Sequence, residues 1–492
     1  MAALSIGPHG PSEANPVRQS TTATAWTFAA LSFLAGGSTA ADIATRLQLP
    51  SGVWVSDGYG YVVDLRPGQQ TLYHIAGESC VLDKIASADL EDFLTADRVQ
   101  LASDRKAFTY GIKYEPHRID FRIQGTLPAP CETPLQDSVD GNFQAFADIF
   151  AANYAFFDLY GVDWNTRVRN ARQRLSPDMT DEELFGLFAQ MISPLEDGHL
   201  ELNAVIDGAD YSAAPKTTPL GRGVRKTAET HGMDEGEVFV AQLENYWVDG
   251  IAAQVLQGKG EVAAGGKMQY GVIDGNIGYI AVLMLTGLTA DDVLSISGVD
   301  DAEGEYAIVN QTMNDAMTLF AETDVEAVII DASINFGGHD FVGREIAARF
   351  ADERRLFMTK RAFDADYGQA TPVYVQPTDR PSFDGPVYLM TTQSTVSAAE
   401  IMTLAFRALP SVTHVGQPTQ GAFSDVLYKT LPNGWEIGMS NEIYRDQNDI
   451  LWEGRGIPPE VFIDIFSETA LVSSHPDAVE RLVALIRQSQ SK

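Results

Sequence analysis

The sequence predicts an α/β core over residues 267–470, preceded by a helical segment and a small β domain. The main observation is an alternation of patterns within the core. Mostly apolar runs of strand length are separated by stretches in which apolar residues recur at helical spacing. The strand patterns lie at 277–283, 325–332 and 386–391, and the helical patterns lie at 305–322, 342–350 and 397–409. Continuous apolar strands that alternate with helices are typical of a layered sheet covered by helices.

The rest of the chain divides into further segments. Short strand patterns separated by Gly, Pro and Asp predict the small β domain. Aromatic residues from Phe143 to Phe157 recur mainly at spacings of three and four, which predicts the helical segment. The segments are a leader at 1–40, the β domain at 50–132, the helical segment at 140–205, a mixed helix and loop connection at 206–266, the core at 267–470 and a C-terminal helix at 471–492.

The leader contains a mostly apolar run of 10 residues, 25–34, followed by small residues at 36–40. This arrangement is typical of a secretory signal peptide with cleavage after Ala40, and it predicts a secreted or periplasmic protein. The alternative is a leader followed by a short buried helix in a cytoplasmic protein. The run is too short to span a bilayer as a helix, and no later segment offers a spanning stretch, so no membrane span is expected.

Composition and charge limit the partners. Lys and Arg number 34 against 67 Asp and Glu, so the formal net charge is −33. Such a surface repels phosphate backbones, and no nucleic-acid partner is expected. The two cysteines, Cys80 and Cys131, form no cluster with histidines, so no metal or other cofactor is expected. They could form a disulfide or stay as two buried thiols, because spacing alone does not decide pairing. The oligomeric state stays open.

Ser397 is the first candidate for chemistry. A buried strand at 386–391 leads through a short turn to a helix that begins at Ser397. This geometry would lift the Ser397 hydroxyl to the edge of the sheet. The Ala398 amide would point into the same space, near the positive end of the helix dipole. The alternative is a capping box, because Glu400 follows Ser397 by three residues.

A pair of glycines after the preceding core strand is the second candidate. Asn335 is followed by Phe336, Gly337, Gly338 and His339. Glycines at the end of a strand let backbone amides approach a ligand closely, and they could supply the other half of an oxyanion hole. The alternative is a plain tight turn. Earlier in the same segment, Asp331 could be a buried structural carboxylate.

Five short motifs follow one another in the core. They are Asp331 with Asn335-Phe-Gly-Gly338, Ser394-Thr-Val-Ser-Ala-Ala-Glu400, Val415-Gly-Gln-Pro-Thr419, Leu431-Pro-Asn-Gly434 and Glu453-Gly-Arg-Gly-Ile-Pro-Pro459. The motifs and their order resemble the tail-specific, or C-terminal processing, serine peptidases, which include the tricorn core protease. The resemblance covers roughly residues 140–470 and implies a crotonase-like layered core. It implies Ser397 as the nucleophile.

The branches of this family differ in the base. The processing peptidases place a lysine directly after a Thr-x-Gly turn, but Ala422 stands at that position here, and Lys429 is expected at the surface. The tricorn-like branch instead uses a histidine from the helical region before the core and a glutamate near its end. His199 and Glu453 match those two positions. The connection at 206–266 has few strand patterns, so no peptide-binding PDZ module is expected.

The resemblance therefore implies acyl transfer to water from a peptide or protein substrate. Ser397 would attack a carbonyl, His199 would accept its proton, and Glu453 would fix the imidazole tautomer. Supporting roles are expected for Asp197, which would orient or cap, and for Asp331 and Asn335; His339 is the competing base. Two alternatives remain open: a non-catalytic binding module for apolar ligands or peptides, and an esterase or amidase of small substrates.

Overall fold

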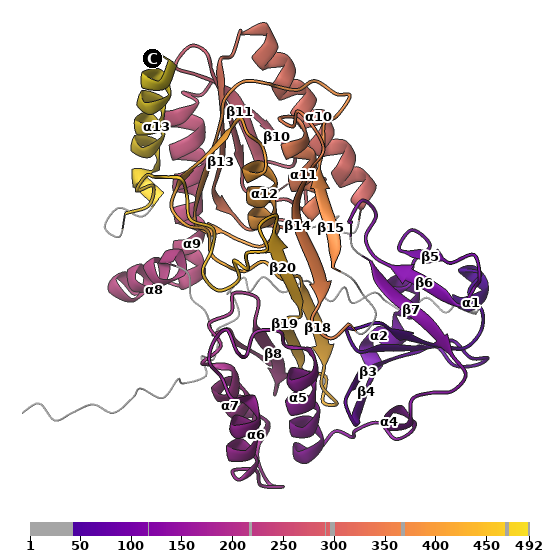
Figure 1. Ribbon diagram of the computed structural model, residues 1–492. Helices are drawn as coiled ribbons and strands as arrows, with labels where there is room; N and C mark the ends of the chain where they lie inside the picture. Colours follow the sequence, from indigo (N-terminus) through magenta and orange to yellow (C-terminus); the bar gives the residue numbers. More distant parts are fainter. Residues whose placement is uncertain are drawn as a thin grey trace, which may run out of the picture.

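The computed structural model describes residues 43–116, 118–215, 219–290, 292–295, 301–365, 370–467 and 472–490 (Figure 1). The predicted leader over 1–40 lies outside the described residues. Within them, no helix combines the length and the apolar character that crossing a membrane requires.

A seven-stranded sheet forms the centre of the core, in the order β10-β11-β12-β13-β16-β17-β21. The strands β12, β13, β16, β17 and β21 are parallel to one another, whereas β11 runs antiparallel to both of its neighbours, β10 and β12. Their bounds are Glu261–Ala263 (β10), Met268–Ile273 (β11), Ile277–Val282 (β12), Ala327–Asn335 (β13), Val387–Thr395 (β16), Val412–Gly416 (β17) and Val461–Phe462 (β21). Every residue of β13 is buried, as expected for a parallel strand covered on both faces. The predicted α/β core is confirmed.

Helices cover both faces of this sheet, and β13 shows how the faces divide. Val328 and Ile330 pack with the helices α10, α11 and α12, whereas Ala327 and Ile329 pack with α8, α9, η1 and α13. On the first face the bounds are Ala302–Glu322 (α10), Asp340–Ala348 (α11) and Ala398–Arg407 (α12). On the second they are Pro219–His231 (α8), Glu235–Glu244 (α9), Asn245–Val255 (η1, a π-helix) and His475–Gln490 (α13), which the short 3₁₀-helix Val472–Ser474 (η2) precedes.

A second layer packs below the core in the view of Figure 1. The helices α5 (Val139–Asn153), α6 (Trp164–Arg172) and α7 (Asp181–Ile192) pack on a sheet in the order β18-β19-β8-β9. The strands are β18 (Val426–Thr430), β19 (Glu436–Ser440), β8 (Glu201–Ile206) and β9 (Ala209–Ala213). Strand β8 thus begins inside the segment predicted to be helical. Because Leu202 of β8 pairs with Ile437 of β19, the residues just before β8 are held against the late part of the core.

The N-terminal β domain is an antiparallel sheet in the order β4-β3-β2-β1-β7-β6-β5. Its strands are Val53–Ser56 (β1), Tyr61–Asp64 (β2), Thr71–Ala76 (β3), Ser79–Asp83 (β4), Val99–Leu101 (β5), Ala107–Tyr110 (β6) and Ile119–Gln124 (β7). Short helices flank it at Ile43–Arg46 (α1), Lys84–Ala88 (α2), Leu90–Phe93 (α3) and Ala129–Glu132 (α4). A disulfide joins Cys80 to Cys131, which decides the question that spacing left open.

A three-stranded sheet, β15-β14-β20, stands between the core and the β domain (Figure 1). Its strands are Arg355–Ala362 (β14), Thr371–Val375 (β15) and Glu442–Asp446 (β20). Nearby, the Lys429 Nζ of β18 donates a hydrogen bond to the Tyr59 carbonyl oxygen at 2.5 Å. The same nitrogen lies 3.1 Å from His74 Nδ1. The expectation that Lys429 lies at the surface is therefore wrong: it is 2% exposed, because the β domain covers it.

Replacing Cys80 and Cys131 together by Ala should lower the unfolding free energy of the β domain by about 3–4 kcal/mol. The disulfide closes a loop over a sequence separation of 51 residues and so restricts the unfolded chain. Differential scanning calorimetry of the wild type and the double variant measures the change. Chemical reduction of the wild type serves as the control and should give the same shift. An unchanged transition after complete reduction would contradict the prediction.

Candidate active site

Ser397 lies between β16 and α12, where the strand, turn and helix pattern predicts it. Its backbone has φ 58° and ψ −132°, a conformation that residues with a side chain rarely adopt. Its side chain makes no capping hydrogen bond to α12. The capping-box alternative is therefore wrong. A strained backbone at a helix start, with the hydroxyl not used as a cap, is a feature that recurs at functional sites.

Glu400 has a different partner from the one that a capping box would give it. Its two carboxylate oxygens accept hydrogen bonds from the backbone amides of Gly421 and Ala422, each at 2.7 Å. The Ala422 carbonyl in turn accepts a hydrogen bond from the Ser397 amide at 3.0 Å. Glu400 is fully buried, so these charge-assisted bonds form away from water. The carboxylate therefore fixes the turn against which the Ser397 backbone is held.

Glu453 binds the next residues of the same turn. Its Oε2 accepts hydrogen bonds from the amides of Phe423 at 3.1 Å and Ser424 at 3.2 Å. Within the described part of the chain, its Oε1 is buried and has no hydrogen-bond partner. Burial raises the pKa of Glu453 well above its usual value, and the negative charges of Asp197 and Glu400 raise it further. Glu453 thus combines one fixed oxygen with one that can still bind a partner.

Asp197 fixes the segment that carries His199. Its Oδ1 accepts hydrogen bonds from the His199 amide at 2.8 Å and from the Ser440 hydroxyl at 3.0 Å. Its Oδ2 accepts one from the Tyr154 hydroxyl at 2.9 Å. Asp197 is 1% exposed, so three donors balance a buried charge. Asp197 is a positioning residue in this arrangement, because it holds the backbone of His199.

The segment at 197–199 lies directly against the 420–424 turn. A Cβ atom added to Gly198 would lie 2.8 Å from the Ala422 Cβ and 2.6 Å from the Gln420 Nε2. Only a glycine allows this approach without a shift of the turn. The segments that carry Ser397, His199 and Glu453 therefore all contact one turn of five residues, although they lie far apart in the sequence.

The two glycines after β13, Gly337 and Gly338, have different contacts. A Cβ atom on Gly337 would lie 2.7 Å from the Ser397 Cβ, so this glycine packs directly on the serine. The Gly337 amide donates to Asn335 Oδ1 at 2.9 Å, and Asn335 Nδ2 donates to the Val282 carbonyl at 2.9 Å. Among the described residues, no acceptor binds the amides of Gly338 and Ala398. Gly338 and Ala398 are therefore the candidate oxyanion donors, and Asn335 shapes their loop.

Two other candidates, Asp331 and His339, have different surroundings. Asp331 is fully buried and accepts hydrogen bonds from Tyr279 and from His475, whose Nε2 lies at 2.6 Å from Oδ2. Because His475 belongs to α13, this carboxylate faces the side of the sheet opposite α12. His339 precedes α11, and its ring stacks on Phe341 at a centroid distance of 5.1 Å. The structure therefore does not bring Asp331 to the candidate site.

Sequence patterns did not indicate three groups that support this site. Tyr154 and Ser440 bind Asp197, and Glu400 fixes the turn. Tyr154 looks like one more member of the aromatic helix pattern, and Ser440 ends an ordinary strand. Glu400 stands out in the sequence because it follows Ser397 by three residues, but this spacing indicates a capping box and not a contact with a distant turn. Only the fold reveals these contacts, because each joins segments that are distant in the sequence.

Replacing Glu400 with Gln should destabilise the protein by about 2–3 kcal/mol and loosen the 420–424 turn. Glutamine has one acceptor oxygen, so one of the amides of Gly421 and Ala422 would face the side-chain NH₂ group. Thermal unfolding and hydrogen exchange of these two amides measure the effect. Glu480→Gln, an exposed change of the same type on α13, should leave both unchanged. Unaltered exchange at Gly421 and Ala422 in Glu400→Gln would contradict the assigned contact.

Replacing Glu453 with Gln should change the pH dependence of stability. A carboxyl whose pKa is raised in the folded state binds more protons there than in the unfolded chain. The wild type therefore loses stability as the pH rises from about 4.3, the usual glutamate value, toward the folded-state pKa. The variant lacks this loss, so its stability relative to the wild type should increase with pH. Denaturant titrations at pH 4 and at pH 8 test this, and an equal difference at both values would rule it out.

Comparisons with known proteins bear on the family resemblance and on the fold. Residues 276–463 match the model of peptidase family S41. A proposed peptidase from Parabacteroides merdae has a similar structure, with a TM-score of 0.54 and 24% identity over 71% of this chain and 97% of that one. Mature CPAF is similar with a TM-score of 0.52 and 13% identity, over 72% of this chain and 99% of the other. The match over residues 276–463 supports the resemblance to serine peptidases that the five ordered motifs predict, and the two structures share the fold.

Proposed function

We propose that this chain hydrolyses peptide bonds through an acyl-enzyme, with Ser397 as nucleophile, His199 as base and Glu453 as the acid that orients His199. The observation that carries the proposal is the 420–424 turn, which contacts the segments of all three residues. A serine hydroxyl needs a base of near-neutral pKa, which histidine supplies. A carboxylate that binds the imidazole fixes its tautomer and stabilises its cation.

The surroundings of Ala422 support histidine as the base. Ala422 stands where other members of the resembled family carry a lysine, and its Cβ faces Gly198 at close range. The segment that carries His199 is thus packed directly against the position at which that lysine would stand. Lys429 is no substitute, because the β domain encloses its ammonium group.

Charge stabilisation in the proposed reaction comes from backbone amides. The amide of Ala398 lies at the start of α12, where the helix dipole favours negative charge, and the amide of Gly338 follows the glycine that packs on Ser397. Two such donors, fixed before the reaction, would hold the developing oxyanion. A Cβ atom on Gly338 would lie 2.6 Å from the Leu285 carbonyl carbon, so this loop has little freedom to move away.

The disulfide supports an extracytoplasmic location. The pair Cys80–Cys131 would form and persist in an oxidising compartment, such as the periplasm or the cell exterior. This agrees with the signal peptide that the sequence predicts for residues 1–40. The proposed substrate is a peptide or an unfolded protein segment that reaches the enzyme there.

Labelling with a serine-directed fluorophosphonate tests the proposal. The wild type should be labelled at Ser397, as located by peptide mass spectrometry, and Ser397→Ala should not be labelled. His199→Ala should label at least about 100-fold more slowly, since general-base assistance contributes about 10²–10⁴-fold. His339→Ala is the matched control and should keep its labelling rate within about threefold.

Each contrary result has a definite meaning. A folded wild type that stays unlabelled would refute the hydrolase assignment and favour a binding module for apolar ligands. Labelling that depends on His339 and not on His199 would refute the assigned base. Labelling with hydrolysis of acyl esters but of no peptide in a mixed library would favour the esterase alternative.

A further inference from the structure

A cavity of about 230 Å³ lies between the β domain and the sheet β15-β14-β20. Tyr59, Tyr61 and Glu115 line it from the N-terminal part of the chain, and Lys360 and Asn441 line it from the core. Pockets for drug-sized ligands usually measure about 300–1,000 Å³. This cavity is smaller, and its size fits one long side chain of a bound peptide.

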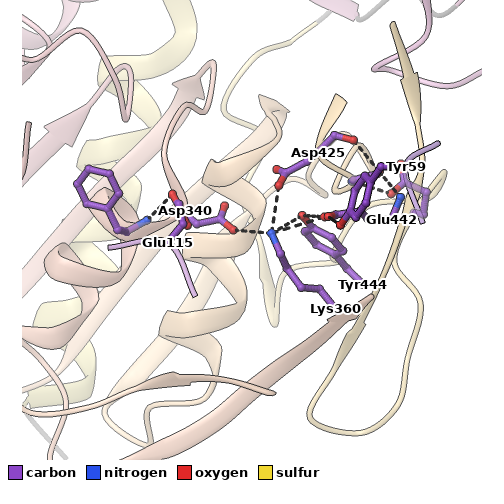
Figure 2. A network of polar contacts seen from close by, with 10 residues as sticks. Tyr59, Glu115, Asp340, Lys360, Asp425, Glu442 and Tyr444 are labelled. Atoms are coloured by element: carbon purple, nitrogen blue, oxygen red, sulfur yellow. Dashed lines mark hydrogen bonds and ion pairs between the residues drawn. The ribbon is translucent and has the colours of Figure 1, made fainter. Parts of the chain in front are cut away.

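Acidic groups outnumber basic groups around this cavity. Figure 2 shows the Lys360 ammonium group among carboxylates. Its Nζ lies 3.1 Å from Asp425 Oδ2, 3.5 Å from Glu442 Oε2 and 3.7 Å from Asp340 Oδ2. Glu115 adds a fourth carboxyl group, against Lys360 and Arg98 as the cations. A ligand that brings a further positive charge would correct this excess.

Two residues that line the cavity, Asn441 and Glu115, each have a buried oxygen without a hydrogen-bond partner in the described part of the chain. Asn441 is fully buried and lines the cavity. Its Nδ2 donates to the Asn153 carbonyl at 2.8 Å and to Asp364 at 3.1 Å, but within the described ranges its Oδ1 has no partner. Glu115 shows the same pattern: Oε1 accepts from the Phe341 amide at 3.3 Å, and the buried Oε2 has no partner there. Buried acceptors without donors are rare, and they fit a ligand that donates hydrogen bonds.

The pKa values of two carboxyl groups in this cluster are raised. Burial raises the pKa of Glu115 to about 8, and the negative charge of Asp340 contributes to the rise. Burial also raises the pKa of Asp340 to about 7, although the nearby Lys360 opposes the shift. Near neutral pH, the Glu115 carboxyl is therefore mainly protonated and the Asp340 carboxyl is partly protonated. An ammonium or guanidinium group placed between them would favour their ionised forms.

The cavity lies close to the candidate active site along two stretches of chain. Asp340 follows the proposed oxyanion residue Gly338 by two positions. Asp425 follows Ser424 directly, and the Ser424 amide is bound to Glu453. The loop of the proposed oxyanion donor and the turn bound to Glu453 each therefore lie within two residues of a member of the acidic cluster.

We propose that this cavity is a specificity subsite that binds a lysine or arginine side chain of the substrate near the cleaved bond. The proposal rests on the peptidase function proposed above. The carboxyl groups and the Asn441 oxygen would accept hydrogen bonds from the cationic head. The rings of Tyr59 and Tyr61 would pack on the aliphatic stem, which is how such side chains combine a charged end with apolar contacts.

Two measurements test the subsite. Digestion of a mixed peptide library with the full-length wild type, read by mass spectrometry, should show Lys and Arg enriched at one fixed position from the cut. Matched fluorogenic peptides with Lys, norleucine or Glu at that position should then differ, with kcat/KM at least about tenfold higher for Lys than for norleucine. Asp425→Asn should reduce this ratio at least about threefold, mainly through KM. The Asp425 side chain is 61% exposed, so this change should not disturb folding.

The controls separate this proposal from the peptidase function itself. Glu115→Gln should reduce the Lys preference in the same direction, whereas Asp449→Asn, a matched change at an 86% exposed side chain outside the cavity, should leave the ratio unchanged. Fluorophosphonate labelling is measured on every sample. Labelled enzyme that cleaves the three peptides equally, or that prefers Glu, would overturn the subsite and leave the peptidase function standing. Absence of labelling in the wild type would overturn the peptidase function.

Discussion

The arrangement of the candidate active site depends on the pair of hydrogen bonds that Glu400 accepts from Gly421 and Ala422. Glu400 lies in the first turn of α12 and so moves with Ser397, while the two amides belong to the turn that contacts the other site segments. A buried carboxylate bound by two backbone amides is a strong and directional link. It therefore sets the position of the turn relative to the serine, and the positions of Glu453 and the His199 segment follow from the turn.

The three carboxylates of the site are buried together, yet they differ in their partners. Glu400 has two amides, and Asp197 has an amide and two hydroxyl groups. Glu453 has two amides on one oxygen and none on the other within the described residues. Burial, and then the negative charges of Asp197 and Glu400, raise the pKa of the carboxyl group that has the free oxygen. That group is Glu453, the carboxylate to which the proposed mechanism assigns an imidazolium partner.

The sequence predicted what depends on local pattern and missed what depends on distant contacts. The buried strands and helices of the core, and the position of Ser397 between them, follow from periodicity over fewer than 20 residues. The role of Glu400 does not follow from periodicity. A glutamate three residues after a serine has the same spacing whether it caps its own helix or binds the amides of a distant turn. Lys429 was assigned to the surface by residue type, although it lies on the same face of β18 as the buried Leu427. The alternation of buried and partly exposed residues along β18 predicts that Lys429 is buried. The β domain that covers this face accounts for its burial.

The β domain lies outside the S41 match, yet its side chains complete the cavity beside the site. The Tyr59 hydroxyl donates to Glu442, which also accepts from Tyr444 at 2.6 Å, and Glu115 binds the start of α11. Without these contacts, Lys360 and its carboxylates would face water, where their charges interact weakly. Because the β domain covers these charges, they can discriminate between substrate side chains in the proposed subsite. In the proposed mechanism, substrate preference is a property of the junction between the β domain and the core, while the reacting groups come from the core and from the segment that carries His199.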